Sequence, residues 1–181
     1  MTFSNSSKNQ IQNRNFLSPT GFKFTVNRSP KVSFFSNSAN IPGLTLGIAN
    51  QPTYLKDIDI PGDKIVFDDF NLKFLVDENL ENYNEIQNWI RGLGYPESLN
   101  EIYGLQSQER YSRAIDSKMM DIYSDGTLQI LTSNMNKNFN VKFIDLFPYQ
   151  LSSLEFDATL TDVQYFTADV TFKYTIYTIE S

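Results

Sequence analysis

The chain has 181 residues, no cysteine, no histidine and a formal net charge of −6, and 14% of its residues are aromatic. The absence of cysteine excludes disulfides and thiolate metal sites, and the absence of histidine removes the commonest general base and the commonest metal ligand. The acidic balance argues against binding nucleic acid by phosphate neutralisation.

The N-terminal residues have no apolar signal core, and no run approaches the roughly 18 apolar residues of a membrane helix, so we expect a soluble protein with no membrane partner. Residues 1–19 are rich in Asn, Ser and Gln and cannot bury enough apolar surface to order alone. We interpret them as a polar N-terminal arm that is either a disordered tail or orders against a neighbouring subunit. Residues 20–181 are predicted to form one β domain.

The first part of this domain alternates in polarity over residues 22–26 and again over 32–39, which indicates two strands joined as a hairpin. Residues 45–59 then form a long connection with scattered apolar side chains. Such a segment is either an interface loop, whose exposed side chains form a contact surface, or an ordinary long hairpin. The candidate contact residues are Ile48, Tyr54, Leu55 and Ile58.

A strand followed by a helix occupies the centre of the chain. Alternation over residues 70–76 leaves Asn71 and Lys73 on the polar side of the strand. The next apolar residues recur at helical spacing, which predicts an amphipathic helix packed on a sheet, with Asn82 as its N-cap. The predicted core residues of this helix are Ile86, Trp89, Ile90 and Leu93.

The second half of the chain ends in its cleanest alternating pattern. Residues 99–120 mix charges with few apolar positions and look like an insertion. Gly126 and the aspartate before it signal a hairpin turn, and a strand over residues 141–147 is expected to stop at the proline that follows. The pattern over residues 164–178 predicts one long strand with a buried face and a polar face. The polar face carries Thr167, Asp169, Thr171, Lys173 and Thr175.

These elements predict a mainly β protein, an antiparallel β-sandwich or open barrel with one amphipathic helix. The chain contains no phosphate-binding glycine loop and no dinucleotide-binding, zinc-protease or serine-hydrolase motif. Asp68 and Asp69 are expected within a strand, where their side chains would point to opposite faces and could not share a metal ion. We therefore predict no catalytic residue, no cofactor, no metal site and no enzymatic activity.

Four stretches follow one another along the chain: TGFKFTVNRSPKVSFFSNSANIPG, IDIPGDKIVFDDFNLKFLVDE, NEIQNWI and FIDLFPYQLSSLEFDA. Their order, with the final alternating strand after them, resembles the tail tube protein family of contractile-tailed, T4-like bacteriophages, including the tube-initiating proteins of the baseplate. The resemblance implies a tail tube-like fold and six-fold rings that join sheet to sheet and stack into a tube. It implies a lumen that conducts DNA during ejection without binding it specifically.

The same resemblance implies a place in the virion tail, assembly in the host cytoplasm, and sheath, tape-measure and baseplate proteins as partners besides further copies of the chain. A lumen that attracted phosphate would stall the genome, so we expect a polar or acidic wall, although Lys173 on the candidate face argues against a purely negative one. The candidate ring-stacking residues are Ile48, Tyr54, Leu55 and Ile58. The candidate lumen residues are Asn71, Lys73, Thr167, Asp169, Thr171 and Thr175.

Several alternatives stay open at this point. The long N-terminal segment and the insertion depart from the simplest tube subunit, and both fit a tube-initiating ring of the baseplate. A small-molecule-binding β-barrel would need an apolar cavity, and a carboxylate-dependent glycan hydrolase would need two carboxylates about 5–9.5 Å apart. The effector tube of a bacterial secretion system shares the expected architecture.

Overall fold

The structure is a computed structural model of the chain, and it describes residues 17, 19, 21–29, 36–94, 96–98, 100–101, 122–157, 159 and 165–180. The predictions for residues 1–19 and 99–120 fall almost wholly outside the described residues. The elements in chain order are β1 (Phe22–Val26), β2 (Ser36–Ala39), β3 (Leu44–Gln51), β4 (Ile58–Phe67), β5 (Phe70–Leu75), α2 (Glu81–Gly94), β6 (Ser124–Leu131), β7 (Lys137–Leu151), β8 (Thr167–Lys173) and β9 (Ile176–Glu180).

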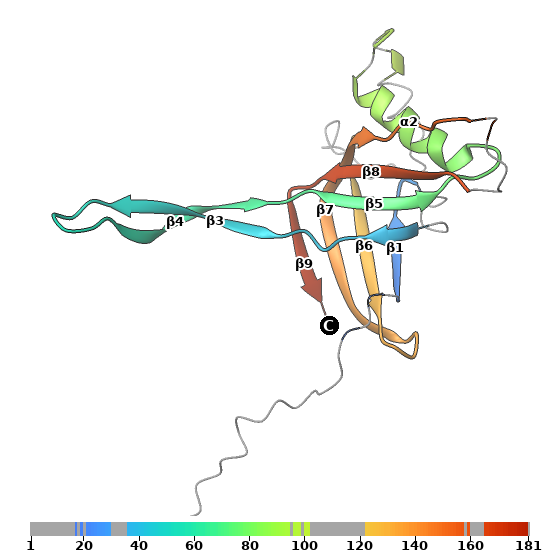
Figure 1. The fold of residues 1–181 in the computed structure, drawn as a ribbon. Helices are drawn as coiled ribbons and strands as arrows, with labels where there is room; N and C mark the ends of the chain where they lie inside the picture. The colour runs from blue at the N-terminus through green and yellow to red at the C-terminus, as the bar shows by residue number, and fades with distance from the viewer. Residues whose placement is uncertain are drawn as a thin grey trace, which may run out of the picture.

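The strands form one bent seven-stranded sheet and a separate two-stranded ribbon. The order in the large sheet is β1-β6-β7-β8-β5-β2, with β9 also paired to β7, and every pairing is antiparallel. The first part of β7 pairs with β6 and β9, whereas its last residues pair with β8, so the sheet folds over along β7. The first layer is β1, β6, β9 and the start of β7; the second layer is β2, β5, β8 and the end of β7 (Figure 1). This confirms the predicted β-sandwich or open barrel.

The bend of β7 corrects the prediction that its strand stops at Pro148. Val141 and Phe143 are buried before the bend, and Leu146 and Pro148 are buried after it, so the inward-facing positions change from odd to even numbers. Asp145, with a φ of 56°, lies at this change, where β7 also shifts its register against β6. Such a bulge inserts one residue and bends the strand, and this lets β7 continue from one layer into the other.

The final strand is divided for the same reason. Residues 164–178 were predicted as one strand, but β8 ends at Lys173 and β9 begins at Ile176. β9 pairs with β7 before its bend, and β8 pairs with β7 after the bend. Phe172 points into the core at the end of β8, whereas in β9 the inward residue is Tyr177, so the buried parity changes here as well. The final strand therefore bends together with its partner.

The described strands of both predicted hairpins find distant partners. β1 pairs with β6, and β2, the described part of the predicted strand 32–39, pairs with β5, while residues 30–35 lie outside the described residues. The hairpin predicted around Gly126 is wrong. Gly126 lies inside β6, opposite Val26 and Phe143, and not in a turn. A Cβ at this position would come within 3.1 Å of the Leu146 side chain and 3.4 Å of the Phe24 ring, so the glycine lets these two side chains pack closely against β6.

The core consists mainly of aromatic rings from both layers. The Phe70 ring lies 4.8 Å from that of Phe24 and 4.6 Å from that of Phe143, which joins the second layer to the first. The Trp89 ring of α2 lies 6.3 Å from that of Phe172, and the Trp89 Nε1 donates a hydrogen bond of 3.0 Å to the Ile122 carbonyl. The helix thus packs against the same core as the two sheets.

Of the four predicted helix core residues, Ile86 and Trp89 are fully buried, and Ile90 and Leu93 are partly buried against the core. The predicted role of Asn82 as N-cap is wrong, because the helix already includes Glu81. The buried Asn82 side chain accepts from the Asp77 amide and donates to the Leu75 carbonyl, at 3.2 and 2.8 Å. It therefore fastens the first turn of α2 to the end of β5.

Replacing Phe70 by Ala is expected to lower the free energy of unfolding by about 3–5 kcal/mol, because the ring is fully buried and its loss leaves a cavity. Phe156→Ala is the matched control. It removes the same atoms from a side chain that is 75% exposed, and is expected to cost about 1 kcal/mol or less. Chemical denaturation followed by the fluorescence of Trp89 measures both, and equal losses would contradict the packing described.

Candidate assembly surfaces

The most prominent surface feature is an arm, residues 44–67, in which β3 and β4 pair only with each other among the described strands. Figure 1 shows the arm projecting well beyond the two layers. The segment 45–59, predicted as either an interface loop or a long hairpin, therefore lies in a hairpin, with a tip at residues 52–57. All residues from 48 to 61 are exposed in the single chain.

The arm carries apolar side chains that the single chain does not cover. Ile48 is 70% exposed, Leu55 91% and Ile58 51%, and Tyr54 at the tip is fully exposed. Further exposed apolar residues of the arm are Leu44, Leu46, Ile60, Ile65 and Val66. Adjacent positions of a strand point to opposite faces, so Ile65 and Val66 place apolar side chains on both faces of the ribbon. A surface of this kind fits protein–protein contact on both sides.

The base of the arm is fastened to the body by a set of hydrogen bonds. Tyr174 donates to the Asp68 carbonyl at 2.7 Å, Tyr177 donates to the Pro42 carbonyl at 3.1 Å, and the Asp68 amide donates to the Gly43 carbonyl at 3.1 Å. Burial raises the pKa of Tyr174 to about 12, so this hydroxyl keeps its proton across the neutral range. The two tyrosine bonds join the residues that flank the arm to the bend after β8 and to β9, and the bond between Asp68 and Gly43 joins the two ends of the arm to each other.

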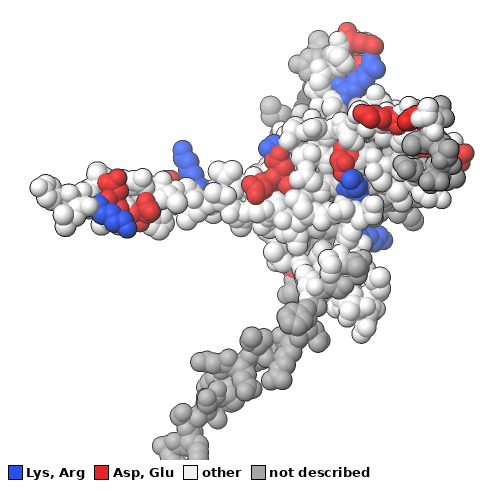
Figure 2. All heavy atoms as spheres, viewed as in Figure 1, with Lys and Arg blue, Asp and Glu red and all other residues white. Residues whose placement is uncertain are grey.

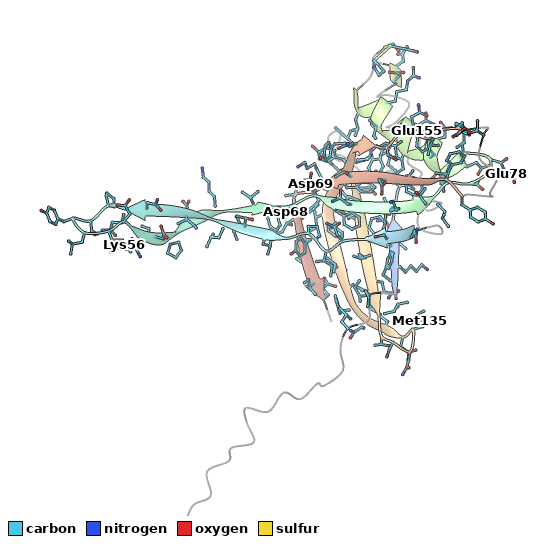
Figure 3. All side chains as sticks on the ribbon, viewed as in Figure 1. Lys56, Asp68, Asp69, Glu78, Met135 and Glu155 are labelled. Carbon is cyan, nitrogen blue, oxygen red and sulfur yellow. The ribbon has the colours of Figure 1, made fainter. Side chains whose placement is uncertain are left out.

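The Asp69 carboxylate adds a charged contact to this base. It accepts a hydrogen bond of 2.8 Å from the Tyr149 hydroxyl and forms an ion pair with Lys173. The hydrogen bond from Lys173 is the main reason that the pKa of Asp69 is lowered, and the same bond raises the pKa of Lys173. Figure 3 shows Asp68 and Asp69 at the junction between arm and body. We call the contacts of these two residues the clamp.

The clamp was missed in the sequence because Asp68 and Asp69 were expected inside a strand. The structure places them in the connection between β4 and β5. A signal was available: apolar residues stand at 65 and 67 and then at 70, 72 and 74, so the alternation loses its phase between Phe67 and Phe70. That change marks the end of one strand and the start of another.

The second layer has a polar outer face that brings together five of the six candidate lumen residues. Asn71 lies opposite Thr171, whose hydroxyl donates to its side-chain oxygen at 3.0 Å, and Lys73 lies opposite Asp169, with the charged atoms 3.6 Å apart. Thr167 lies at the end of the same face, opposite Leu75. The sixth candidate, Thr175, lies in the bend after β8, where its amide donates to the Ile144 carbonyl.

Charges on the polar face are balanced in pairs. Lys73 faces Asp169, and Lys173 contacts Asp69, so each lysine of this face has an aspartate beside it. In the described ranges, no three acidic side chains come close enough together to hold a metal ion. No helix in the described part of the chain combines the length and apolarity needed to cross a bilayer.

The edges of both layers are the last feature relevant to assembly. Among the described strands, β1, β2 and β9 each have a ladder partner on one side only. In the second layer, residues 147–151 of β7 pair with β8 alone as far as the described residues show, so within this part of the chain the layer has an open edge at each end. Unpaired strand edges are ready to pair with another chain.

The whole chain is similar to proteins of one family and one fold. Residues 4–180 match a family model described as "Phage tail tube protein". The fold is similar to the tube-terminating cap of the anti-feeding prophage (TM-score 0.58, 13% identity, 98% of this chain and 99% of that chain). It is also similar to a sheath–tube complex of the extracellular contractile injection system PVC in the extended state (0.56, 13%, 93% and 93%). The 6-fold symmetrised baseplate of the anti-feeding prophage is a further relative in fold (0.57, 10%, 87% and 89%). No curated protein sequence matches the chain.

Acid is expected to loosen the arm before it unfolds the body. Because the pKa of Asp69 is lowered in the fold, its ionised contacts stabilise the native state above the ordinary carboxyl pKa of about 3.9, and they are lost as the pH falls through the lowered value. A fluorophore on Tyr54→Cys, the sole cysteine of that variant, should lose anisotropy below about pH 4 while the circular dichroism stays native.

Two variants test whether the clamp causes this change. Asp69→Asn should leave the labelled arm mobile even at neutral pH. Asp125→Asn removes the same charge from an exposed position of β6 and should behave like the parent. An arm that stays rigid in Asp69→Asn at neutral pH would show that the carboxylate does not hold it.

Proposed function

This chain belongs to the phage tail tube protein family, and from that premise we propose that it forms six-membered rings that stack into a tail tube whose lumen conducts DNA during ejection. The observation that carries the proposal is the arm, which exposes apolar side chains on both faces and so calls for neighbouring copies to cover them. Proteins of this family and fold are structural tube proteins, so the role is a structural one.

Ring closure follows from the open edges of the second layer. Its four strands run in alternating directions from residues 147–151 through β8 and β5 to β2. Because four is an even number, the next subunit's residues 147–151 would run antiparallel to β2, and the same ladder pattern would continue from copy to copy. A head-to-tail interface of this kind generates a closed ring when the rotation between neighbouring copies closes on itself. The number six is the family expectation, and the related baseplate is described as 6-fold symmetrised.

The polar face of the second layer would line the lumen. Asn71, Lys73, Thr167, Asp169 and Thr171 share this face, and Thr175 would lie at its rim in the bend after β8. Paired charges leave little net field, and free charges are screened within about 10 Å at 0.1 M salt. Such a wall would neither hold nor strongly repel a phosphate backbone, which suits DNA passage without specific binding.

Stacking is assigned to the arm, through Ile48, Tyr54, Leu55 and Ile58. Outside the tube, the expected partners are sheath, tape-measure and baseplate proteins, in a virion tail assembled in the host cytoplasm. A tube-initiating ring at the baseplate is the second candidate, supported by the fold similarity to the baseplate structure. A ligand-binding barrel is disfavoured because the Phe24, Phe70 and Phe143 rings fill the space between the layers.

Shortening the arm is expected to abolish polymerisation and leave the body folded. Ile48 and Pro61 lie directly opposite each other, so residues 49–60 can be replaced by an Asn-Gly turn without changing the strands below. Electron microscopy of the purified protein, alone and with baseplate, measures the result, and circular dichroism checks the fold. The control, Asn50→Ala with Asp59→Ala, changes an opposed polar pair and keeps the apolar side chains. If the shortened protein still forms tubes of normal length, the arm is not the element that joins the rings.

The lumen assignment can be mapped with single cysteines, because the natural chain has none. In assembled tubes, Thr171→Cys should react with a small maleimide but not with a maleimide attached to a folded protein, since the lumen excludes it. Thr178→Cys, exposed on β9 in the other layer, should react with both reagents. Unassembled subunits should react with both at either position. A Thr171→Cys tube that accepts the bulky reagent would place this face outside the lumen.

A further inference from the structure

A second exposed apolar surface lies on the body, apart from the arm. Phe156 follows β7 and is 75% exposed, and its ring packs at a tilt of 53° against that of the 38% exposed Phe166 just before β8, with the ring centroids 4.7 Å apart. Tyr165, the neighbour of Phe166, is 81% exposed. The amide of Val76 donates to the Phe166 carbonyl at 2.9 Å, which fixes this segment to the end of β5. We call Phe156, Tyr165 and Phe166 the aromatic patch.

The aromatic patch and the tip of the arm lie on opposite sides of the molecule. Figure 3 shows Lys56 near the far end of the arm, and Glu78 and Glu155 on the side of the body that faces away from it. Phe166 is hydrogen-bonded to Val76 at the end of β5, whereas the arm leads into the start of β5, so the patch lies at the end of this strand opposite to the arm. Surfaces at opposite poles are what head-to-tail stacking requires, because each copy must offer one surface forwards and the other backwards.

The two surfaces also match in polarity. The tip, residues 52–57, carries the exposed Tyr54 and Leu55, and its only charged residues are Lys56 and Asp57. Figure 2 shows its outermost part uncharged, with the charged atoms set back from the end. Glu155, next to Phe156 in the chain, is exposed, and Figure 2 shows acidic atoms at the end of the body away from the arm. An apolar centre with a polar rim is the usual anatomy of a specific interface, and Lys56 gives the tip one group that can pair with a carboxylate.

We propose that the aromatic patch is the docking site for the arm tip of a second copy of this chain in the adjacent ring, a contact that rests on the proposed function. Tyr54 and Leu55 would cover Phe156 and Tyr165, and Lys56 would lie near Glu155. Each subunit then donates one arm and receives another. The contact is heterologous and open, so it extends a tube without limit, whereas ring closure through strand edges stays within one layer.

Cross-linking between two single-cysteine variants tests the contact directly. Lys56→Cys and Glu155→Cys leave the apolar residues of both surfaces in place, and the natural chain contributes no other thiol. When the two proteins are mixed, assembled and treated with a short bis-maleimide, we expect covalent dimers. Lys56→Cys mixed with Thr178→Cys is the matched control and should give none. Dimers from the control alone, or no dimers from either mixture at any protein concentration, would overturn the proposal.

The energetic test uses the exposed side chains of the aromatic patch. Phe156→Ala should raise the protein concentration needed for polymerisation by about tenfold or more, as expected for an aromatic anchor, and circular dichroism should show a native fold. Lys56→Glu should weaken assembly, and Glu155→Lys in the same chain should partly restore it. Phe156→Ser is a second variant at the same position. If it polymerises at the same protein concentration as the parent, the aromatic patch is not the docking site.

The two proposals can fail separately. If the parent protein forms no tubes, either alone or with baseplate, the proposed function is wrong. Tubes in which Glu155→Cys reacts with a bulky maleimide as readily as in the free subunit remove only the docking site. In that case the aromatic patch would face outwards, toward a sheath or another partner, and the proposed tube function would be unaffected.

Discussion

The long strand β7 belongs to both layers, and its change of direction at Asp145 is the constraint on which the rest of the structure depends. Val141 and Phe143 face the core before the bend, and Leu146 and Pro148 face it afterwards. An unbent strand of the same sequence would turn its second half inside out, because side chains alternate with a period of two. The left-handed backbone at Asp145 therefore allows one strand to bury apolar residues in both layers.

The aromatic core fills the space between the two layers, so the apolar side chains of the arm are not buried inside the same subunit. The core between the layers is filled by rings such as Phe24, Phe70 and Phe143, and the arm extends beyond it. The clamp through Asp68 and Asp69 holds the base of this arm in one position. A segment already fixed in direction loses less conformational entropy when a neighbour covers it, so in the proposed tube the clamp would favour assembly.

The polar face of the second layer has its charged and polar side chains paired with one another, whereas the arm exposes apolar side chains. Its lysines lie beside Asp69 and Asp169, and Asn71 and Thr171 satisfy each other across the strands. The arm, by contrast, leaves Ile48 and Leu55 uncovered. The described residues thus separate a face whose charges are already paired from an arm whose apolar side chains are uncovered. The proposed tube would use the first for its lumen and the second for contact between copies.

Local patterns in the sequence determined the elements that depend on neighbours along the chain. The alternation around Phe70 and Leu72 and the helical spacing of Ile86 and Trp89 predicted a strand and a helix at these places, and composition predicted a mainly β fold without histidine or cysteine chemistry. These features could be read directly because side-chain periodicity is a property of consecutive residues.

Tertiary structure alone decided which strands pair, where they bend and what the acidic residues do. Gly126 looked like a turn residue and is a packing residue, because its neighbours Phe24 and Leu146 come from distant parts of the chain. The role of Asp69 depends on Tyr149 and Lys173, which lie 80 and 104 positions further along the chain. Strand partners and bulges are chosen by the packing of the whole core, and no window of local sequence contains that information.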